Sequence, residues 1–226
     1  GKVPFYEPDL DAVLARNIDA GRLRFTTSFQ EAAEFGDIHF ICVGTPQQSG
    51  AYAADLSQVF GSIESLAPYL SPIDLVVGKS TVPVGTANQI AEMLKVAAPG
   101  VEVAWNPEFL REGFAVQDTL EPDRLVVGVR SPEAESKLRE VYATMIDKEI
   151  PFLVTDFPTA ELVKVAANSF LATKISFINA MAEVCEAAGA DVVQLAEAIG
   201  HDTRIGNRFL NAGLGFGGGC LPKDIR

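Results

Sequence analysis

The residues with the clearest chemical potential lie near the end of the sequence, around Cys220. Three glycines precede this cysteine, and Leu-Pro-Lys-Asp follows it. Because glycine has no side chain to keep a ligand away, another molecule can approach the sulfur closely. Pro222 suits the first turn of a helix, so we expect Cys220 at or just before a helix N-terminus, where partial positive charge favours a thiolate. The pattern therefore predicts a nucleophilic cysteine, with Lys223 nearby and Asp224 on the same helix face.

A structural cysteine is the alternative for Cys220, since most unpaired cysteines are small buried hydrophobic residues. The glycines before it and the charges after it favour the reactive interpretation, because a core cysteine needs neither. The same stretch contains the pattern G-x-G-x-x-G at Gly213, Gly215 and Gly218. A dinucleotide loop of this kind must follow a strand and open a helix. Residues 204–211 do not have the pattern of a buried strand, so we reject that interpretation.

Further polar candidates stand apart from Cys220. Lys164 and Asn168 are four residues apart in an apolar helical run, so their side chains share one face and must meet partners there. The alternative is a lysine that reaches solvent and an asparagine bonded to the backbone. Ser80 and Thr81 follow an expected strand, where a simple helix cap is the alternative role.

Two more patterns are weak when taken alone. Glu108 and Glu112 flank Phe109-Leu110-Arg111, and they could be a solvated pair of which one caps a helix. Arg204, in Asp-Thr-Arg-Ile-Gly-Asn, has the pattern of an ordinary surface arginine. Neither pattern identifies a site by itself.

The elements that position these residues alternate between helix and strand up to residue 155, which predicts an α/β fold with a doubly wound parallel sheet. Helices are expected after Thr27-Ser28 and at 9–20, 55–70, 86–98 and 132–146. Strands are expected at 23–26, 37–43, 73–77, 101–104, 124–129 and 152–154. Polar loops follow the strands that end at Val43, Val77 and Ala104, which is where open α/β sheets bind ligands.

From Pro158 the strand patterns stop, and one apolar helical run continues to Ala188, with Gly189 as the expected stop. At about 1.5 Å per residue this helix would be about 45 Å long. It is apolar almost all round, so we expect it to be buried on several sides. We interpret it as the link between two domains and as a subunit contact, followed by a second helix at 191–199.

The composition is that of an ordinary globular protein, with 48% hydrophobic and 21% charged residues in a chain of 226. The net charge of −12 disfavours nucleic acid as a partner. Three distant cysteines suit a reducing cytosol better than a disulfide framework. His39 and His201 have no Cys or His neighbour at ligand spacing, so no metal site is expected. No signal peptide is evident, and no apolar run approaches the roughly 18 to 20 residues of a membrane span, so we expect a cytoplasmic protein.

Together these motifs resemble the UDP-glucose/GDP-mannose dehydrogenase family from end to end of the chain. The matching segments are VGTP at 43–46, STVPVG at 80–85, NPEFLREG at 106–113, KVAAN at 164–168, RIGN at 204–207 and GGGCLPKD at 217–224. The last motif is specific. The resemblance implies an incomplete Rossmann-like NAD-binding domain over residues 1–155. It also implies a long connecting helix and the start of an all-helical central domain over residues 156–226, which forms a homodimer.

The resemblance further implies an enzyme that oxidises the C6 alcohol of UDP-glucose to the carboxylate of UDP-glucuronate in two steps, using two NAD⁺. Cys220 would attack the intermediate aldehyde, and the thiohemiacetal would lose a second hydride to leave a thioester that water hydrolyses. Lys164 and Asn168 would stabilise negative charge on the C6 oxygen. The residues that would hold and activate water or relay protons are Thr81, Glu108 and Asp224, and which of them is the base stays open.

The same resemblance places residues at the two ligands. Those beside NAD would be Thr45, Ser80, Thr81, Glu112 and Lys223. Those that line the nucleotide-sugar pocket would be Glu108, Phe109, Leu110, Lys164, Asn168, Arg204, Gly213, Phe216 and Gly217. In some members of the family the arginine reaches the sugar across a subunit boundary.

Some parts of the family are not in this sequence. Its members begin with a strand, a G-x-G-x-x-G loop and a second strand, and they end with a nucleotide-sugar domain. The chain opens at Gly1 without a methionine, and Arg226 ends it a few residues into the helix expected at Pro222. We therefore expect an internal fragment that binds NAD poorly or not at all and turns over nothing by itself.

Two alternatives stay open. A sister enzyme would act on GDP-mannose or a UDP-N-acetylhexosamine, although the loop at 108–113 and the segment at 167–170 look more like the UDP-glucose branch. A scaffold fragment would be non-catalytic and would keep the long helix for dimerisation. Cys220 would be unreactive in that case.

Overall fold

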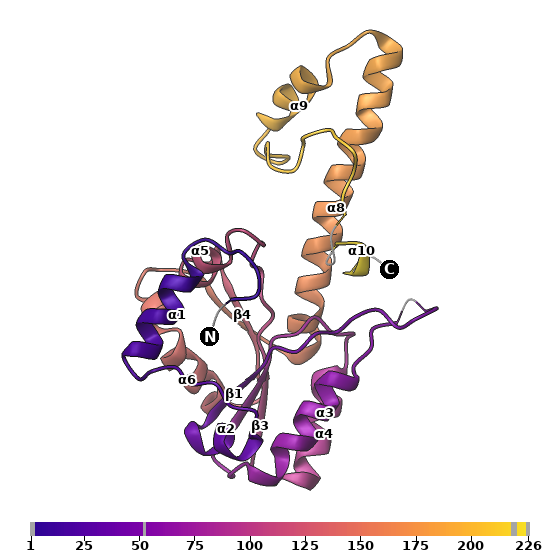
Figure 1. The fold of residues 1–226 in the computed structure, drawn as a ribbon. Coiled ribbons are helices and arrows are strands. Elements are labelled where there is room, and N and C mark those ends of the chain that lie inside the picture. The colour runs from indigo at the N-terminus through magenta and orange to yellow at the C-terminus, as the bar shows by residue number, and fades with distance from the viewer. Residues whose placement is uncertain (1–2, 52, 218–220, 225–226) are drawn as a thin grey trace. The chain divides into compact units, whose positions relative to one another are not determined.

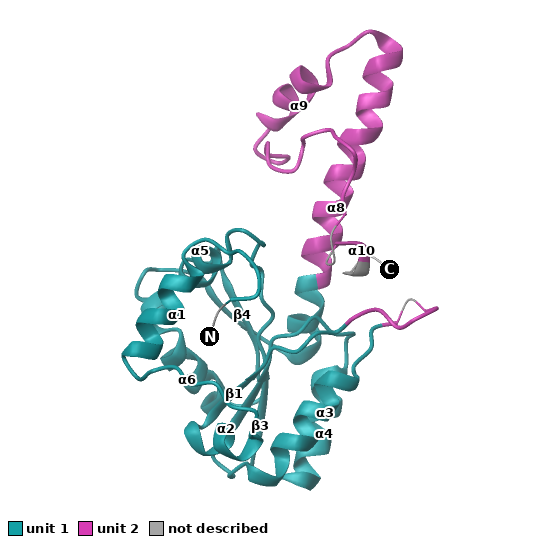
Figure 2. Ribbon diagram, viewed as in Figure 1, with its two compact units in different colours: residues 1–45, 54–164 teal, residues 46–53, 165–226 magenta. Residues whose placement is uncertain are grey.

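The structure is a computed structural model, and it describes residues 3–51, 53–217 and 221–224. The chain divides into two compact units (Figure 2). The sheet unit comprises residues 1–45 and 54–164, and the helical unit comprises residues 46–53 and 165–226. All five strands of the described residues belong to the sheet unit. This unit also contains the strand-end loops that carry several of the predicted site residues.

The sheet has the strand order β1-β2-β3-β4-β5. Figure 1 labels β1, β3 and β4 of this sheet. Its strands are β1 (Ile38–Ile41), β2 (Leu75–Gly78), β3 (Glu102–Trp105), β4 (Leu125–Gly128) and β5 (Phe152–Thr155). All neighbours pair in parallel except β3 and β4, which are antiparallel. The predicted α/β class with a parallel sheet is thus confirmed, except that β3 and β4 are antiparallel. A parallel strand requires a crossover connection, whereas the chain between β3 and β4 forms loops and one short helix, α5 (Ala115–Leu120).

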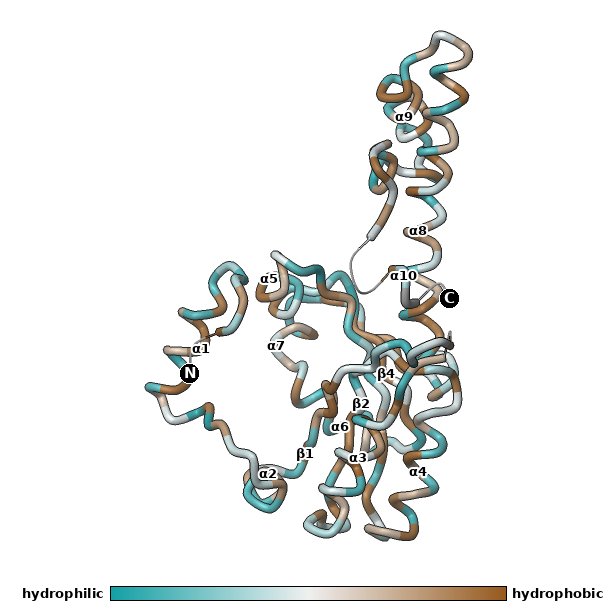
Figure 3. Tube along the Cα trace, turned by 45° about the vertical axis from the view of Figure 1, so that its right-hand side comes forward, coloured by the Kyte–Doolittle hydropathy of each residue, from teal (hydrophilic) through white to brown (hydrophobic). Residues whose placement is uncertain are grey.

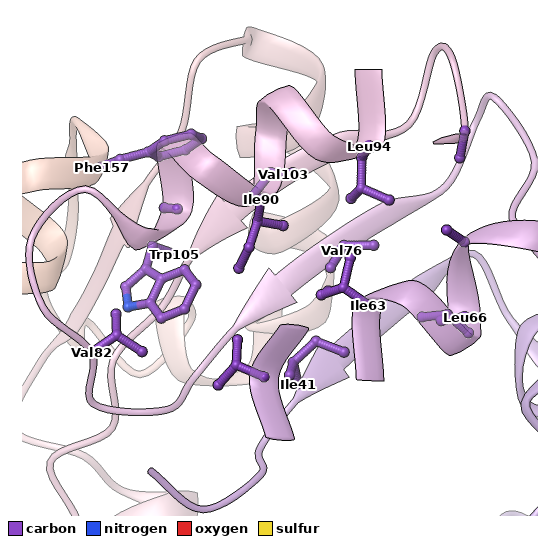
Figure 4. Close-up of a cluster of buried hydrophobic side chains, with 14 of the residues drawn as sticks. Ile41, Ile63, Leu66, Val76, Val82, Ile90, Leu94, Val103, Trp105 and Phe157 are labelled. Atoms are coloured by element: carbon purple, nitrogen blue, oxygen red, sulfur yellow. The ribbon is translucent and has the colours of Figure 1, made fainter. Parts of the chain in front are cut away.

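The core lies on both faces of the sheet. Strands β2 and β4 are both Leu-Val-Val-Gly and are buried at every position, as is typical of strands covered on two sides. Helices α3 (Ser57–Leu66) and α4 (Thr86–Ala97) cover one face through Ile63, Leu66, Ile90 and Leu94 (Figure 4). Helix α6 (Pro132–Val141) covers the other face through Leu138. In Figure 3, hydrophilic and hydrophobic residues alternate along α3 and α4, as expected of helices with one buried side.

Gly78, the last residue of β2, lies opposite Trp105, the last residue of β3. A Cβ atom at Gly78 would lie 2.0 Å from the indole ring, so glycine is needed for the two strands to pair here. Trp105 is only 1% exposed and belongs to the core cluster shown in Figure 4. It also pairs with Gly128 of β4. The tryptophan therefore fills the core immediately before the loop that begins at Asn106.

The remaining helices of the sheet unit are α1 (Leu10–Asp19), α2 (Phe29–Phe35), the 3-10 helix η1 (Ala67–Tyr69) and α7 (Ala143–Ile146). The predicted cap of α2 is confirmed, because the Ser28 hydroxyl accepts a hydrogen bond from the Glu31 amide. The strand predicted at 23–26 is wrong. A strand needs a hydrogen-bonded neighbour, and no described segment pairs with these residues. The Thr26 hydroxyl instead bonds Glu31 and the Ser28 amide.

The long helix predicted from Pro158 is α8 (Phe157–Ala188), which begins in the sheet unit and continues into the helical unit. It is followed by α9 (Val192–Gly200) and the short α10 (Leu221–Asp224). Gly189 has φ +69°, as expected of the residue that ends a helix. Large apolar side chains of α8 are exposed in the described part of this single chain, namely Leu162, Phe170, Phe177 and Val184. The expected burial on several sides, which includes a subunit contact, stays a prediction. None of the described helices has the length and apolarity that a membrane crossing requires.

Candidate active site

The loops that leave β1 and β2 are joined by hydroxyl groups. The Thr45 hydroxyl donates to the Thr81 carbonyl at 2.7 Å, and the Ser80 hydroxyl donates to the Val43 carbonyl at 2.6 Å. Thr45 and Ser80 are buried. The alternative of a helix cap at Ser80 is wrong, because the N-cap of α4 is Gly85 and the Ser80 hydroxyl bonds the preceding strand-end loop instead. The structure therefore brings Thr45, Ser80 and Thr81 together at the carboxyl end of the parallel strands.

Lys164 and Glu108 form an ion pair in the sheet unit. Lys164 Nζ lies 3.1 Å from Glu108 Oε1, and the lysine side chain is 8% exposed while the glutamate side chain is 32% exposed. The other carboxylate oxygen of Glu108 accepts a hydrogen bond from the Leu110 amide at 2.7 Å. The alternative of a lysine that reaches solvent is therefore wrong. A buried cation can stabilise an oxyanion. The partly exposed carboxylate beside it can exchange protons with solvent.

The Phe109 ring contacts two cationic side chains. Arg124 lies over it at 3.9 Å from the guanidinium carbon to the ring centre, and Lys164 Nζ lies 5.8 Å from the same centre. Such cation–π contacts hold the ring in one orientation. Phe109 thus belongs to the Lys164–Glu108 group, whereas Leu110 is partly exposed next to it.

The segment after Leu110 is fixed by two acidic residues. Arg111 makes a bidentate pair with Asp118, whose pKa is lowered by hydrogen bonds from the arginine. The backbone amides of Gly113 and Ala115 donate to the buried Glu7 carboxylate at 2.8 and 2.7 Å. These contacts leave Glu112 exposed. Sequence reasoning missed Glu7, because its partners lie more than 100 residues away and no local pattern marks them.

Glu161 is a second residue that sequence reasoning missed. It lies on α8, is 2% exposed, and accepts hydrogen bonds from the Gly85 amide at 2.7 Å and the Ala87 amide at 2.6 Å. A carboxylate in this place satisfies backbone donors at the start of α4, whose N-cap residue has no side chain to do so. The bonds join α8 to α4 one helical turn before Lys164. An acidic residue inside the apolar run was the only available signal.

In the helical unit the predicted residues lie on separate elements. Asn168 is half-buried on α8. Arg204 is exposed and pairs with Asp202 at 2.6 Å, and this pairing raises the arginine pKa. Lys174 Nζ donates to the Ile205 and Gly206 carbonyls and so holds the loop that carries Arg204.

A pocket of about 560 Å³ lies in the same unit beside α8. The Gly213 amide donates to Asn179 Oδ1 at 2.9 Å, which fixes the glycine-rich segment against the helix. The pocket is lined by Ser176, Asn179, Ala182, Glu183, Glu186, Gly213, Leu214, Gly215 and Phe216. Two of the predicted sugar-binding positions, Gly213 and Phe216, therefore line one hollow, and Gly217 follows them as an exposed residue.

Cys220 lies outside the described residues, so its predicted meeting with Lys164 and Asn168 stays a prediction. Helix α10 begins at Leu221, in agreement with the helix start predicted from Pro222. Lys223 and Asp224 belong to this helix. No described group of three His, Cys, Asp or Glu side chains could hold a metal ion.

Two family descriptions match the chain. The NAD binding domain of the UDP-glucose/GDP-mannose dehydrogenase family matches residues 1–146, and the central domain of that family matches residues 158–226. The UDP-glucose 6-dehydrogenase of Rickettsia typhi is 48% identical over 223 residues, which are 99% of this chain and 51% of that protein. The UDP-glucose 6-dehydrogenase of Bacillus subtilis is 44% identical over 227 residues, again 99% and 51%. The chain thus spans about half the length of the curated relatives it matches.

Solved structures of nucleotide-sugar dehydrogenases also match the chain. A UDP-glucose dehydrogenase from the archaeon Pyrobaculum islandicum matches with a TM-score of 0.92 and 42% identity, over 99% of this chain and 52% of that one. A GDP-mannose dehydrogenase from Pseudomonas aeruginosa matches with a TM-score of 0.82 and 31% identity, over 99% and 53%. Sequence identity is therefore higher to the first of these two structures.

Proposed function

Because the chain belongs to the UDP-glucose/GDP-mannose dehydrogenase family, we propose that it forms part of an enzyme that oxidises the C6 alcohol of UDP-glucose to a carboxylate with two NAD⁺. Each turnover consumes one sugar, one water and two NAD⁺, and it yields UDP-glucuronate, two NADH and three protons. The observation that carries the proposal is the buried Lys164 cation, 3.1 Å from Glu108. Oxidation of an alcohol requires groups of this kind, one to stabilise an oxyanion and one to move a proton.

The polar residues would divide these tasks. Lys164 and Asn168 would stabilise negative charge on the C6 oxygen as the alcohol becomes an aldehyde. Thr81, Glu108 and Asp224 would hold the attacking water and relay protons. Glu108 suits proton exchange because its side chain is 32% exposed, so a proton can pass from it to solvent.

Cys220 would carry the second oxidation. Its sulfur would form a bond to the aldehyde carbon, and the aldehyde oxygen would take a proton to give a thiohemiacetal. Loss of a hydride from that carbon and a proton from the oxygen leaves a thioester. Water then adds at the carbon, the carbon–sulfur bond breaks, and the thiol is released with the carboxylate.

Residues at the strand ends of the sheet unit would hold NAD, which would supply the hydride acceptor for both oxidations when bound. The hydroxyls of Thr45 and Ser80 both donate to backbone carbonyls, so their oxygens can only accept hydrogen bonds from a ligand. Acceptors suit the amide N–H groups of a nicotinamide. The residues proposed to hold NAD are Thr45, Ser80, Thr81, Glu112 and Lys223. Those proposed to line the sugar pocket are Phe109, Leu110, Arg204, Gly213, Phe216 and Gly217, together with Glu108, Lys164 and Asn168.

The domain assignment follows from the same argument. Residues 1–155 would form part of the NAD-binding domain, and residues 156–226 would form the connecting helix and the start of the central domain. The exposed apolar side chains of α8, among them Phe170 and Phe177, support a homodimer through this helix. We also propose a cytoplasmic location, because three distant cysteines suit a reducing compartment.

An assay of the full-length protein tests the function. NADH formation would be followed with UDP-glucose, GDP-mannose and UDP-N-acetylglucosamine, and we expect UDP-glucose to give two NADH per sugar. The 226-residue chain alone should give none, because it covers about half the length of its relatives. One NADH per sugar would contradict the thioester step, and faster oxidation of another sugar would favour a sister enzyme. Oxidation of UDP-glucose by the 226-residue chain would contradict its inactivity.

A non-catalytic scaffold is the alternative of another class, and thiol labelling across pH distinguishes it. Peptide mapping separates Cys220 from the other two cysteines. Cys185 is buried and should label slowly. Cys42 is exposed, but desolvation raises the pKa of its thiol, so it should label at higher pH than a free thiol. We expect Cys220 to label with a pKa below that of a free thiol, about 8.5. A value at or above that of a free thiol would favour the scaffold.

A further inference from the structure

A buried network of polar side chains lies at the start of the two loops that carry Thr81 and Glu108. Its centre is Asn106, which is 1% exposed. The Asn106 side-chain nitrogen donates to the Val126 carbonyl at 2.8 Å. Its side-chain oxygen accepts from Lys79 Nζ at 3.0 Å and from the Tyr142 hydroxyl. One amide thus connects β4, the residue after β2 and the break between α6 and α7.

The network occupies a weak point of the sheet. Strands β3 and β4 share a single register pair, Trp105 with Gly128, so few backbone hydrogen bonds hold them together. The Asn106 side chain supplies a bond to β4 where the backbone ladder does not. A buried amide with three partners is costly to disrupt, because each lost bond leaves a polar group without water. The position of Asn106 is therefore firmly fixed.

Two members of the network, Lys79 and Asn106, lie close in sequence to residues of the proposed site. Lys79 immediately precedes Ser80 and Thr81, and its backbone amide donates to the Ile41 carbonyl at 2.9 Å. Asn106 is two residues before Glu108, and its backbone amide donates to the Gly78 carbonyl at 2.8 Å. The bond between the Lys79 and Asn106 side chains thus joins the starting points of both loops.

The titratable groups around the network act on the pKa values of Lys79 and Tyr142. The groups that face Lys79 are Cys42, Glu108 and, through Asn106, Tyr142. Burial lowers the pKa of Lys79, while Cys42 and Glu108 oppose this change. Burial and the neighbouring Cys42 raise the pKa of Tyr142 to about 12, so its hydroxyl keeps the proton that it donates to Asn106.

We propose that Lys79, Asn106 and Tyr142 are positioning residues that set the separation between Thr81 and Glu108. The inference rests on the proposed function, because it assigns the network a purpose in that oxidation. The three residues act through the loops and need not touch the sugar. Displacing catalytic groups by as little as about 1 Å can lower a rate by about a hundredfold, so small changes in the network should be visible in kcat.

Tyr142→Phe in the full-length protein tests the inference, because it removes one oxygen and keeps the ring. We expect kcat with UDP-glucose to fall about tenfold or more, while the KM values for sugar and NAD change less than about threefold. Lys79→Met should act in the same way, and Lys79→Arg should recover part of the rate. The matched controls are Tyr69→Phe and Lys95→Met, both at exposed positions, which should leave kcat unchanged.

A second measurement does not depend on activity. In amide NMR spectra of the 226-residue chain, Tyr142→Phe should shift the signals of Thr81 and Glu108, whereas Tyr69→Phe should shift neither. Shifts confined to the surroundings of residue 142, or an unchanged kcat in a variant with a lower Tm, would overturn the positioning role. If the unsubstituted full-length protein does not oxidise UDP-glucose, the proposed function fails, and the NMR comparison still decides whether the network couples the loops.

Discussion

Replacing Lys164 with methionine in the full-length protein should reduce kcat with UDP-glucose by about a hundredfold to a thousandfold. The lysine supplies a positive charge in a place where its side chain is 8% exposed, and water cannot replace that charge efficiently. Methionine has a similar length and fills the same space without a charge. The fold should persist, because the partner carboxylate of Glu108 is 32% exposed and can be hydrated when the cation is lost. Initial-rate kinetics with UDP-glucose would measure the effect.

Lys95→Met is the matched control for this substitution. Lys95 lies on α4, its side chain is 73% exposed, and its contact with Glu92 is an ordinary surface pair at 3.6 Å. Its replacement should change kcat by less than about twofold, because exposed pairs contribute little. An unchanged kcat in Lys164→Met would show that the buried cation has no part in the chemistry. A raised KM with unchanged kcat would assign it to binding alone.

Replacing Glu161 with glutamine should lower the free energy of unfolding of the 226-residue chain by about 2 to 4 kcal/mol. The carboxylate accepts from two backbone amides at the start of α4, at Gly85 and Ala87. An amide side chain has one oxygen, so its nitrogen would face a donor. One buried N–H would then lose its partner at a site that is 2% exposed. Urea unfolding followed by circular dichroism would measure the loss.

Glu133→Gln provides the comparison for Glu161. Glu133 lies in the first turn of α6, where it is exposed, and the Ser131 hydroxyl already caps that helix. Its replacement should cost less than about 1 kcal/mol, which is the usual size of a surface interaction with a helix dipole. Equal losses for the two variants would mean that the Glu161 bonds contribute nothing beyond helix-end electrostatics.

Helices and strands whose patterns lie within neighbouring residues could be predicted from the sequence. The apolar runs of β2 and β4 and the long helix α8 were found in this way, because burial on both faces and helical continuity are visible in neighbouring residues. The reversal between β3 and β4 could not be predicted, since strand direction depends on where the chain crosses the sheet. The segment 23–26 failed for a related reason. Its pattern is that of a strand, but pairing depends on a neighbour that local sequence does not specify.

In the candidate site, too, local motifs could be predicted from the sequence, whereas contacts between distant residues could not. Lys164 and Glu108 were each named from their motifs, but their ion pair joins residues 56 positions apart (164 − 108) and follows from the tertiary fold alone. Glu7 and Glu161 were missed, because each is an isolated acidic residue whose partners are backbone amides far away in the chain. Asn106 opens the segment NPEFLREG at 106–113, whose pattern predicts roles only for other residues. Its three side-chain bonds join it to three separate segments of the chain, which no spacing rule can specify.

Trp105 is the sole tryptophan of the sequence, and its indole ring is 1% exposed, packed against Gly78. Its fluorescence therefore arises from one place, next to the loop that carries Glu108. A ring shielded from water emits at shorter wavelength than a hydrated one, so a red shift would report the opening of the sheet at this point. The 226-residue chain thus contains its own optical label, and unfolding at the strand ends can be followed without attaching a dye.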